Sequence, residues 1–122
     1  MATRHIGNHI DFVELPAPSV EALGRAKTFL GEVFGWSFHD FGPDYADLTG
    51  AGLGAGLNAD PQHRPAHPLV VVYATHLEVV RERVLKAGGT LTRDIFEFPG
   101  GRRFHFTDPA GNELAVWSDR AA

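Results

Sequence analysis

The strongest constraint on the fold is that the two halves of the chain repeat the same order of elements. Each half predicts a strand, then a helix that ends at glycine, then three more strands, although few residues are identical between the halves. The first module spans about residues 9–59 and the second about residues 69–118. Residues 60–68 contain three prolines and no periodicity, which indicates an extended connector. We therefore expect one α+β domain over residues 1–122, built by internal duplication.

The first module opens with a predicted strand at 9–15 and a helix that follows Ser19, a typical N-cap residue, and ends at Gly35. Apolar residues recur at three- and four-residue intervals in this helix and predict its buried stripe: Val20, Leu23, Ala26, Phe29 or Leu30, and Val33 or Phe34. The three strands that follow are expected at 36–41, at 45–49 and in the glycine-rich stretch that ends at Asn58.

The second module begins with the apolar run 69–73, which predicts a buried strand. Thr75 and Glu78 have the spacing of a capping box, so we expect them to begin the second helix, which ends at the glycine pair 88–89. The apolar stripe of this helix is Leu77, Val80, Val84 and Ala87. Three strands are expected after it, at 90–96, 102–107 and 113–118.

Composition excludes several classes of function. The chain has no cysteine, which removes thiol nucleophiles, thiolate metal sites and disulfide frameworks. Its formal net charge is −4, the wrong sign for a surface that binds duplex nucleic acid or an anionic membrane. The longest apolar run, Leu69 to Ala74, is too short for a signal peptide or a membrane span. We expect a cytoplasmic protein with neither nucleic acid nor membrane as a partner.

The closing segment, from Phe98 to Trp117, carries an Asp-Pro-Ala-Gly-Asn turn at 108–112 that leads into a strand. Together with the first helix and its exit, residues 25–36, this segment resembles the vicinal oxygen chelate superfamily, which includes glyoxalase I, bleomycin-resistance proteins and extradiol dioxygenases. The resemblance covers about residues 9–118. It implies two βαβββ modules that form a cup-shaped mixed β-sheet, the glyoxalase/bleomycin resistance/dihydroxybiphenyl dioxygenase-like fold, commonly completed across a homodimer.

The same resemblance implies where a metal would bind. Members of the superfamily that do chemistry usually hold a divalent metal through His, Gln or Glu side chains on the first and last strands of the modules. In this chain the corresponding positions fall on Phe12, on the stretch 54–58, near Leu69 and on Ala115. None of these side chains is a carboxylate or an imidazole. We therefore expect the fold without the usual metal site, and predict no cofactor.

The favoured hypothesis is a homodimeric, metal-independent protein of the glyoxalase/bleomycin-resistance type that binds a small organic molecule. The candidate residues lining its site are Phe12, Glu14, Leu69, His105 and Trp117, and no catalytic residue is assigned. The alternative is a lyase, isomerase or dioxygenase with an unorthodox site, with or without a divalent metal, built from Glu14, His67, His105 and Glu113. A third hypothesis is an interaction module that binds no ligand.

Several of these side chains have a simpler interpretation. For Glu14 a solvated or helix-capping carboxylate is favoured over a lining residue, and Trp117 is at least as consistent with a core or dimer-interface residue. Alternation puts Arg103 and His105 on one face of their strand, but the sequence leaves open whether that face meets the site or solvent. Asp108, in the turn, is expected to cap backbone amides.

Overall fold

The computed structural model describes residues 5–121, which form two compact units. The first unit comprises residues 12–69, and the second comprises residues 70–121 together with residues 5–11. Each module has the element order βαβββ, so the α+β class and the duplicated modules expected from the sequence are confirmed. No helix within residues 5–121 is long and apolar enough to cross a membrane.

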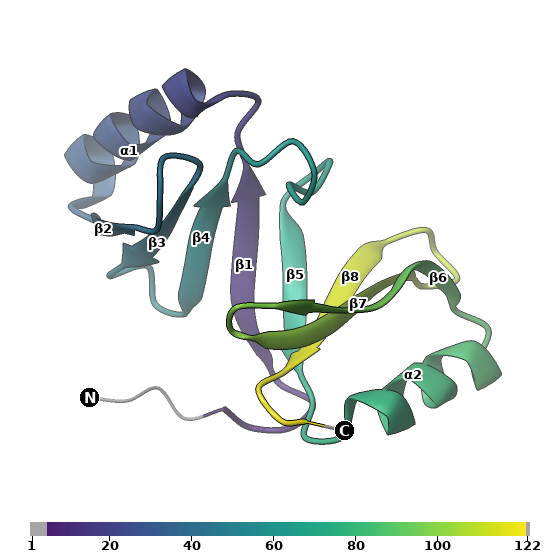
Figure 1. Cartoon of the computed structure of the whole chain (residues 1–122). Helices are drawn as coiled ribbons and strands as arrows, with labels where there is room; N and C mark the ends of the chain where they lie inside the picture. Colours follow the sequence, from purple (N-terminus) through teal and green to yellow (C-terminus); the bar gives the residue numbers. More distant parts are fainter. Residues whose placement is uncertain (1–4, 122) are drawn as a thin grey trace. The chain divides into compact units, whose positions relative to one another are not determined.

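The first unit contains four paired strands and one helix (Figure 1). Its elements are β1 (Ile10–Pro16), α1 (Val20–Phe34), β2 (Ser37–Asp40), β3 (Tyr45–Thr49) and β4 (Gly54–Asn58). The strand order is β2-β3-β4-β1, in which β1 and β4 are parallel and the other pairs are antiparallel.

The second unit repeats this arrangement strand for strand (Figure 1). Its elements are β5 (Leu69–Tyr73), α2 (Leu77–Lys86), β6 (Thr90–Phe98), β7 (Gly101–Thr107) and β8 (Glu113–Ser118). The order β5-β8-β7-β6 again pairs the first strand of the module with its last strand in parallel. Residues 5–11 run beside β5, where the Asn8 amide donates to the Tyr73 carbonyl at 2.8 Å.

Helix α1 begins and ends where the sequence predicts. The Ser19 hydroxyl accepts a hydrogen bond from the Ala22 amide at 3.0 Å, and Gly35 ends the helix in the left-handed conformation, with φ of 73°. The buried stripe is narrower than expected: Leu23, Ala26 and Leu30 pack on the sheet. The prediction was wrong for Val20, Val33 and Phe34, which are 49%, 53% and 59% exposed, because four strands cover only one side of the helix.

Helix α2 begins one residue later than the predicted capping box. His76 is its N-cap residue, and its side chain caps no backbone amide. The Glu78 carboxylate pairs instead with the Arg102 guanidinium on β7. An ion pair to a neighbouring strand therefore replaces the expected local cap.

Each unit has its own apolar core between helix and sheet. Under α1 the buried residues include Leu23, Leu48 and Leu57. Under α2 they are Ala74, Leu77, Phe104 and Val116, with Val80 and Val84 of the helix packed against them. The helices thus occupy one face of each sheet, and the polar residues of interest lie on the opposite face.

Candidate functional site

The orientation of β7 shows on which face of the sheet Arg103 and His105 lie, which the sequence left open. Phe104 and Phe106 pack in the core under α2. Because side chains alternate along a strand, Arg103 and His105 lie on the face opposite α2. The neighbouring strand β8 presents Ala115 beside His105 and Trp117 beside Arg103 on that same face. We call this surface the second-unit face.

His105 is a buried imidazole on the second-unit face. Its side chain is 7% exposed, so the interpretation of a solvated strand face was wrong. Its Nε2 atom has no hydrogen-bond partner within residues 5–121. Burial, together with the charges of Arg103 and Arg93, lowers the pKa of His105 to about 4. The ring is therefore neutral at physiological pH, with one buried nitrogen for which the described residues supply no partner.

Arginine and aromatic side chains surround this imidazole. The guanidinium carbon of Arg93 lies 3.7 Å from the centre of the Phe96 ring, and that of Arg103 lies 5.4 Å from the same centre. The Phe96 ring is in turn 5.8 Å from the His105 ring. Strand pairing sets these contacts, since Arg93 lies opposite His105 and Phe96 lies opposite Arg103.

Strand alternation does not predict that Arg93 and Phe96 both lie on the second-unit face with His105. These residues are three apart, which in a regular strand would put them on opposite faces. The structure has irregularities in the β6–β7 pairing on both sides of Arg93, and these bring both side chains to the second-unit face. The segment 90–98 contains no glycine or proline that would signal these bulges.

A second aromatic cluster surrounds Trp117 on the same face. The indole Nε1 donates to an Asp11 carboxylate oxygen at 2.9 Å, and the other oxygen of Asp11 lies 2.8 Å from Nδ1 of His5. The His5 ring stacks on Tyr73 with centres 5.0 Å apart, and Trp117 lies edge-on to Tyr73 at 5.1 Å. Trp117 is thus held by hydrogen bonding and stacking within its own unit.

Glu113, a residue of the enzyme alternative, lies further along the second-unit face. It pairs with Thr107 across β7, two positions from the pair formed by Ala115 and His105. Its carboxylate accepts a hydrogen bond from the Thr92 hydroxyl at 2.9 Å. The structure therefore brings Glu113 to the same face as His105 and gives its carboxylate a partner on β6.

In the first unit, Phe12 and Glu14 lie on the face opposite α1. Glu14 is 2% exposed, and one of its oxygens accepts a hydrogen bond from the Asn58 amide at 2.8 Å. The interpretation of Glu14 as a solvated or helix-capping carboxylate was therefore wrong. Asn58, which sequence reasoning did not single out, also accepts a bond from the Asp60 amide at 2.8 Å.

Glu14 lies in a row of polar residues that crosses the first sheet. It pairs with Gly56, Gly56 with Asp47, and Asp47 with His39. A side chain at position 56 would collide with the Tyr45 ring, so glycine leaves room for that ring in the middle of the row. Burial raises the pKa of the Asp47 carboxyl, against a hydrogen bond from Tyr45 and the charge of His39.

The remaining residues predicted from the sequence occupy simpler positions. Leu69 is the first residue of β5 and is 1% exposed, and His67 is exposed in the connector. Asp108 accepts bonds from the Ala110 and Asn112 amides, both at 2.9 Å, which confirms its predicted capping role.

The residues present do not fit the divalent metal that the resemblance implies. The positions where its ligands are expected carry Phe12, Leu69 and Ala115, whose side chains have no donor atoms. Within residues 5–121, no group of three or more His, Asp or Glu side chains is arranged to hold a metal ion. Glu14 is instead hydrogen-bonded to an amide, which is a poor second ligand.

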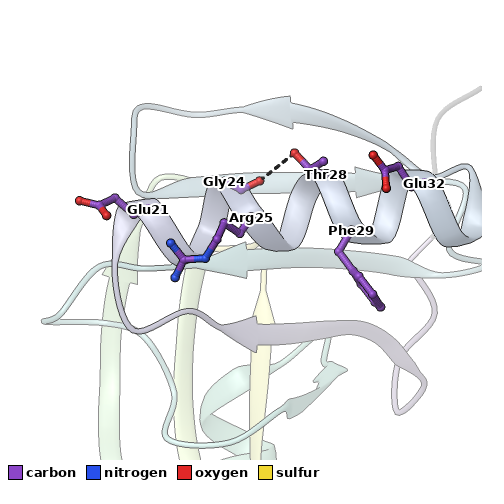
Figure 2. Close-up of a pocket in the computed structure, with 6 residues that line it drawn as sticks. All are labelled: Glu21, Gly24, Arg25, Thr28, Phe29 and Glu32. Carbon is purple, nitrogen blue, oxygen red and sulfur yellow. Dashed lines mark hydrogen bonds between the residues drawn. The ribbon is translucent and has the colours of Figure 1, made fainter.

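A surface hollow of about 600 Å³ lies on the exposed side of α1, away from the polar face of the first unit. Figure 2 shows its lining residues along one side of the helix, with the Thr28 hydroxyl donating to the Gly24 carbonyl at 3.3 Å. Its charged residues, Glu21, Arg25 and Glu32, are all exposed. Because the hollow holds no buried polar group, it offers less specific chemistry than the second-unit face.

Two βαβββ modules, each with polar residues on the face opposite its helix, define a known class of small α+β proteins. The family model of the Glyoxalase/Bleomycin resistance protein/Dioxygenase superfamily matches residues 9–116. The chain belongs to this superfamily, and the resemblance noted from the sequence is confirmed. A search of curated protein sequences finds no match.

Solved structures share the fold at low sequence identity. A structure described as the NAD-dependent benzaldehyde dehydrogenase of Legionella pneumophila has a TM-score of 0.71 at 12% identity, covering 88% of this chain and 97% of that one. Methylmalonyl-CoA epimerase from Mycobacterium tuberculosis has a TM-score of 0.65 at 12% identity, with coverages of 99% and 94%. The Mn(II)-bound glyoxalase of Novosphingobium aromaticivorans has a TM-score of 0.65 at 20% identity, covering 94% of this chain but 40% of that one. These likenesses show the fold alone.

Proposed function

We propose that this chain is a metal-independent, small-molecule-binding member of the superfamily, and that its ligand contacts the second-unit face. The observation that carries this proposal is the His105 imidazole, 7% exposed, with an Nε2 atom that lacks a partner within residues 5–121. A buried polar atom without a partner costs stability, so it is retained where function uses it. The rings of Phe96 and Trp117 on the same face supply apolar surface for an organic molecule.

Of the lining residues predicted from the sequence, His105 and Trp117 belong to the second-unit face. Phe12, Glu14 and Leu69 belong to the first unit, and their role as lining residues stays a prediction. We also propose that the protein is a cytoplasmic homodimer. Its net charge of −4 disfavours nucleic acid and anionic membranes as partners.

A thermal-shift screen tests the proposed function. Small organic acids, amines and neutral aromatic compounds are added separately to full-length protein in the presence of EDTA. A compound at a hundred times its Kd adds about 2.7 kcal/mol of stability, which raises the Tm of a domain this size by about 10 °C. We expect at least one such compound. No shift with any compound at saturating concentration would contradict the proposal.

Matched variants then locate the binding. His105→Gln removes the buried imidazole of the second-unit face, whereas His76→Gln makes the same exchange at an exposed N-cap position whose side chain caps no amide. The Tm shift should be reduced in His105→Gln and kept in His76→Gln. Equal shifts in both variants would place the ligand elsewhere. Native mass spectrometry of untagged protein prepared without chelator tests the dimer and reports any retained metal.

An enzyme remains the second candidate, because His105 and Glu113 lie on the same face of the second unit. Such an enzyme would be a lyase, isomerase or dioxygenase that also uses Glu14 and His67. Substituting Glu14 and His105 together would abolish turnover of any substrate found for it. Unchanged turnover in that double variant would exclude this site.

A further inference from the structure

The charge on the second-unit face indicates a chemical class of ligand. Arg93 is half-buried, and its guanidinium lies over the Phe96 ring. It forms no ion pair within residues 5–121. The Arg103 guanidinium carbon lies 5.4 Å from the centre of the same ring. The surroundings of His105 are therefore rich in positive charge.

Several acidic residues of this unit have partners elsewhere, and Glu97 of β6 lies opposite Arg102, on which its charge acts. Asp94 pairs with the Arg81 guanidinium, and Glu78 pairs with that of Arg102. Glu113 accepts a hydrogen bond from the Thr92 hydroxyl, and Asp119 accepts one from the Tyr73 hydroxyl. Asp11 is bonded to His5 and Trp117. The charges that act on the His105 imidazole are those of Arg103 and Arg93, and both oppose its protonation. An anion placed beside Arg93 and His105 would offset the charge of Arg93, which has no ion-pair partner within residues 5–121.

The flat side chains on this face place a second requirement on the ligand. Guanidinium groups and aromatic rings alternate along the face, in the order Arg93, Phe96, Arg103 and Phe98. The guanidinium carbon of Arg103 lies 5.6 Å from the centre of the Phe98 ring. The Phe98 ring then lies 6.3 Å from that of Trp117. Flat aromatic and guanidinium groups favour a flat partner, because both stack on π-faces.

We propose that the second-unit face binds a planar organic carboxylate, whose anionic oxygens are held by Arg93 and by Nε2–H of His105 and whose flat body packs on Phe96, Phe98 and Trp117. A guanidinium and an N–H donor are the groups that recognise a carboxylate most strongly in proteins. This inference rests on the proposed function and specifies its ligand class.

Three probes with one ring system test the ligand class by isothermal titration calorimetry. They are naphthalene-2-carboxylate, naphthalene-2-carboxamide and 2-(aminomethyl)naphthalene, which carry an anionic, a neutral and a cationic group on the same flat body. We expect the carboxylate to bind full-length protein at least tenfold more tightly than the amide, and the ammonium compound not to bind. This comparison uses the wild-type chain, so it does not depend on the folding of a variant.

A pair of charge-removing variants tests the role of Arg93. Arg93→Gln should weaken binding of the carboxylate about tenfold or more and leave the amide unchanged, a difference of one charge-assisted hydrogen bond. Arg83→Gln on the exposed side of α2 removes the same charge at a distance from the face and should change neither. In addition, saturation with the carboxylate should raise the pKa of His105 measured by NMR.

The outcomes separate this inference from the proposed function. If the amide or the ammonium compound binds as tightly as the carboxylate, the face binds small molecules but the ligand class is wrong. If Arg93→Gln binds the carboxylate as wild type does, Arg93 does not hold the anion and the inference is overturned. If no probe binds although the thermal-shift screen yields ligands, the class is again wrong and the proposed function stands.

Discussion

The buried imidazole of His105 should make the protein less stable as the pH falls. Burial and the charges of Arg103 and Arg93 lower the pKa of His105 from its ordinary 6.5 to about 4 in the folded chain. Between these two values the unfolded chain takes up a proton that the folded chain does not. The stability linked to His105 is therefore complete above about pH 6.5 and declines as the pH falls toward about 4.

The two pKa values fix the size of the effect. Linkage gives a loss of about 2 kcal/mol of unfolding free energy between about pH 8 and about pH 5 from this one residue. In His105→Gln nothing at this position titrates, so the variant should lose about 2 kcal/mol less than wild type over the same interval. Other titrating groups are common to both proteins, and their contributions cancel in the difference.

The assay is urea unfolding followed by far-UV circular dichroism at both pH values. His76→Gln is the matched control, because it exchanges the same side chains at an exposed position of the same unit. If His105→Gln proves too unstable to measure, NMR titration of the His105 ring in wild type reports its pKa directly. Equal losses in wild type and His105→Gln, or a measured pKa near 6.5, would refute the assignment of His105 as a buried neutral imidazole.

Three substitutions test the framework around the site by urea unfolding. Ser19→Ala removes the hydroxyl that caps α1 and should cost about 1 kcal/mol, whereas an unchanged midpoint would show that this cap does not contribute. Phe104→Ala empties a fully buried position under α2 and should cost about 3–5 kcal/mol, and a loss under about 1 kcal/mol would contradict the packing described. Gly56→Ala puts a methyl group against Tyr45 and Phe12 and should cost about 1–3 kcal/mol. Unchanged stability would show that the Tyr45 ring moves aside freely and would contradict the close packing at this position.

The arrangement within each module followed from sequence because its signals are local. Strand alternation, the Ser19 cap and the Gly35 exit of α1 depend on neighbouring residues, and the structure confirms each of them. The Asp108 turn is local in the same sense, and its side-chain bonds were predicted correctly. That residues 1–122 form one domain stays a prediction.

The errors arose where distant segments decide the outcome. The capping box at Thr75 and Glu78 was lost because Arg102, on another strand, binds Glu78. The width of the stripe on α1 depends on how much sheet lies beneath it, and periodicity alone does not supply that information. In both cases the local pattern was present, and a tertiary contact or its absence overrode it.

The candidate site was predictable only in part. Alternation correctly placed Arg103 and His105 on one face, and the structure shows which face it is. Arg93 and Phe96 were missed because bulges in β6 shift their register. The hydrogen bond between Glu14 and Asn58 joins residues 44 positions apart, and the pairing of β1 with β4 brings them together.

The central claim is that the second-unit face around His105 binds a small molecule without a metal. The most direct test records the imidazole nitrogen resonances of full-length, EDTA-treated protein during titration with the strongest compound from the thermal-shift screen. The account predicts a saturable shift of the His105 Nε2 resonance, with the exposed His76 resonances unchanged. Binding that leaves His105 unmoved, or that occurs only after a divalent metal is restored, would contradict it.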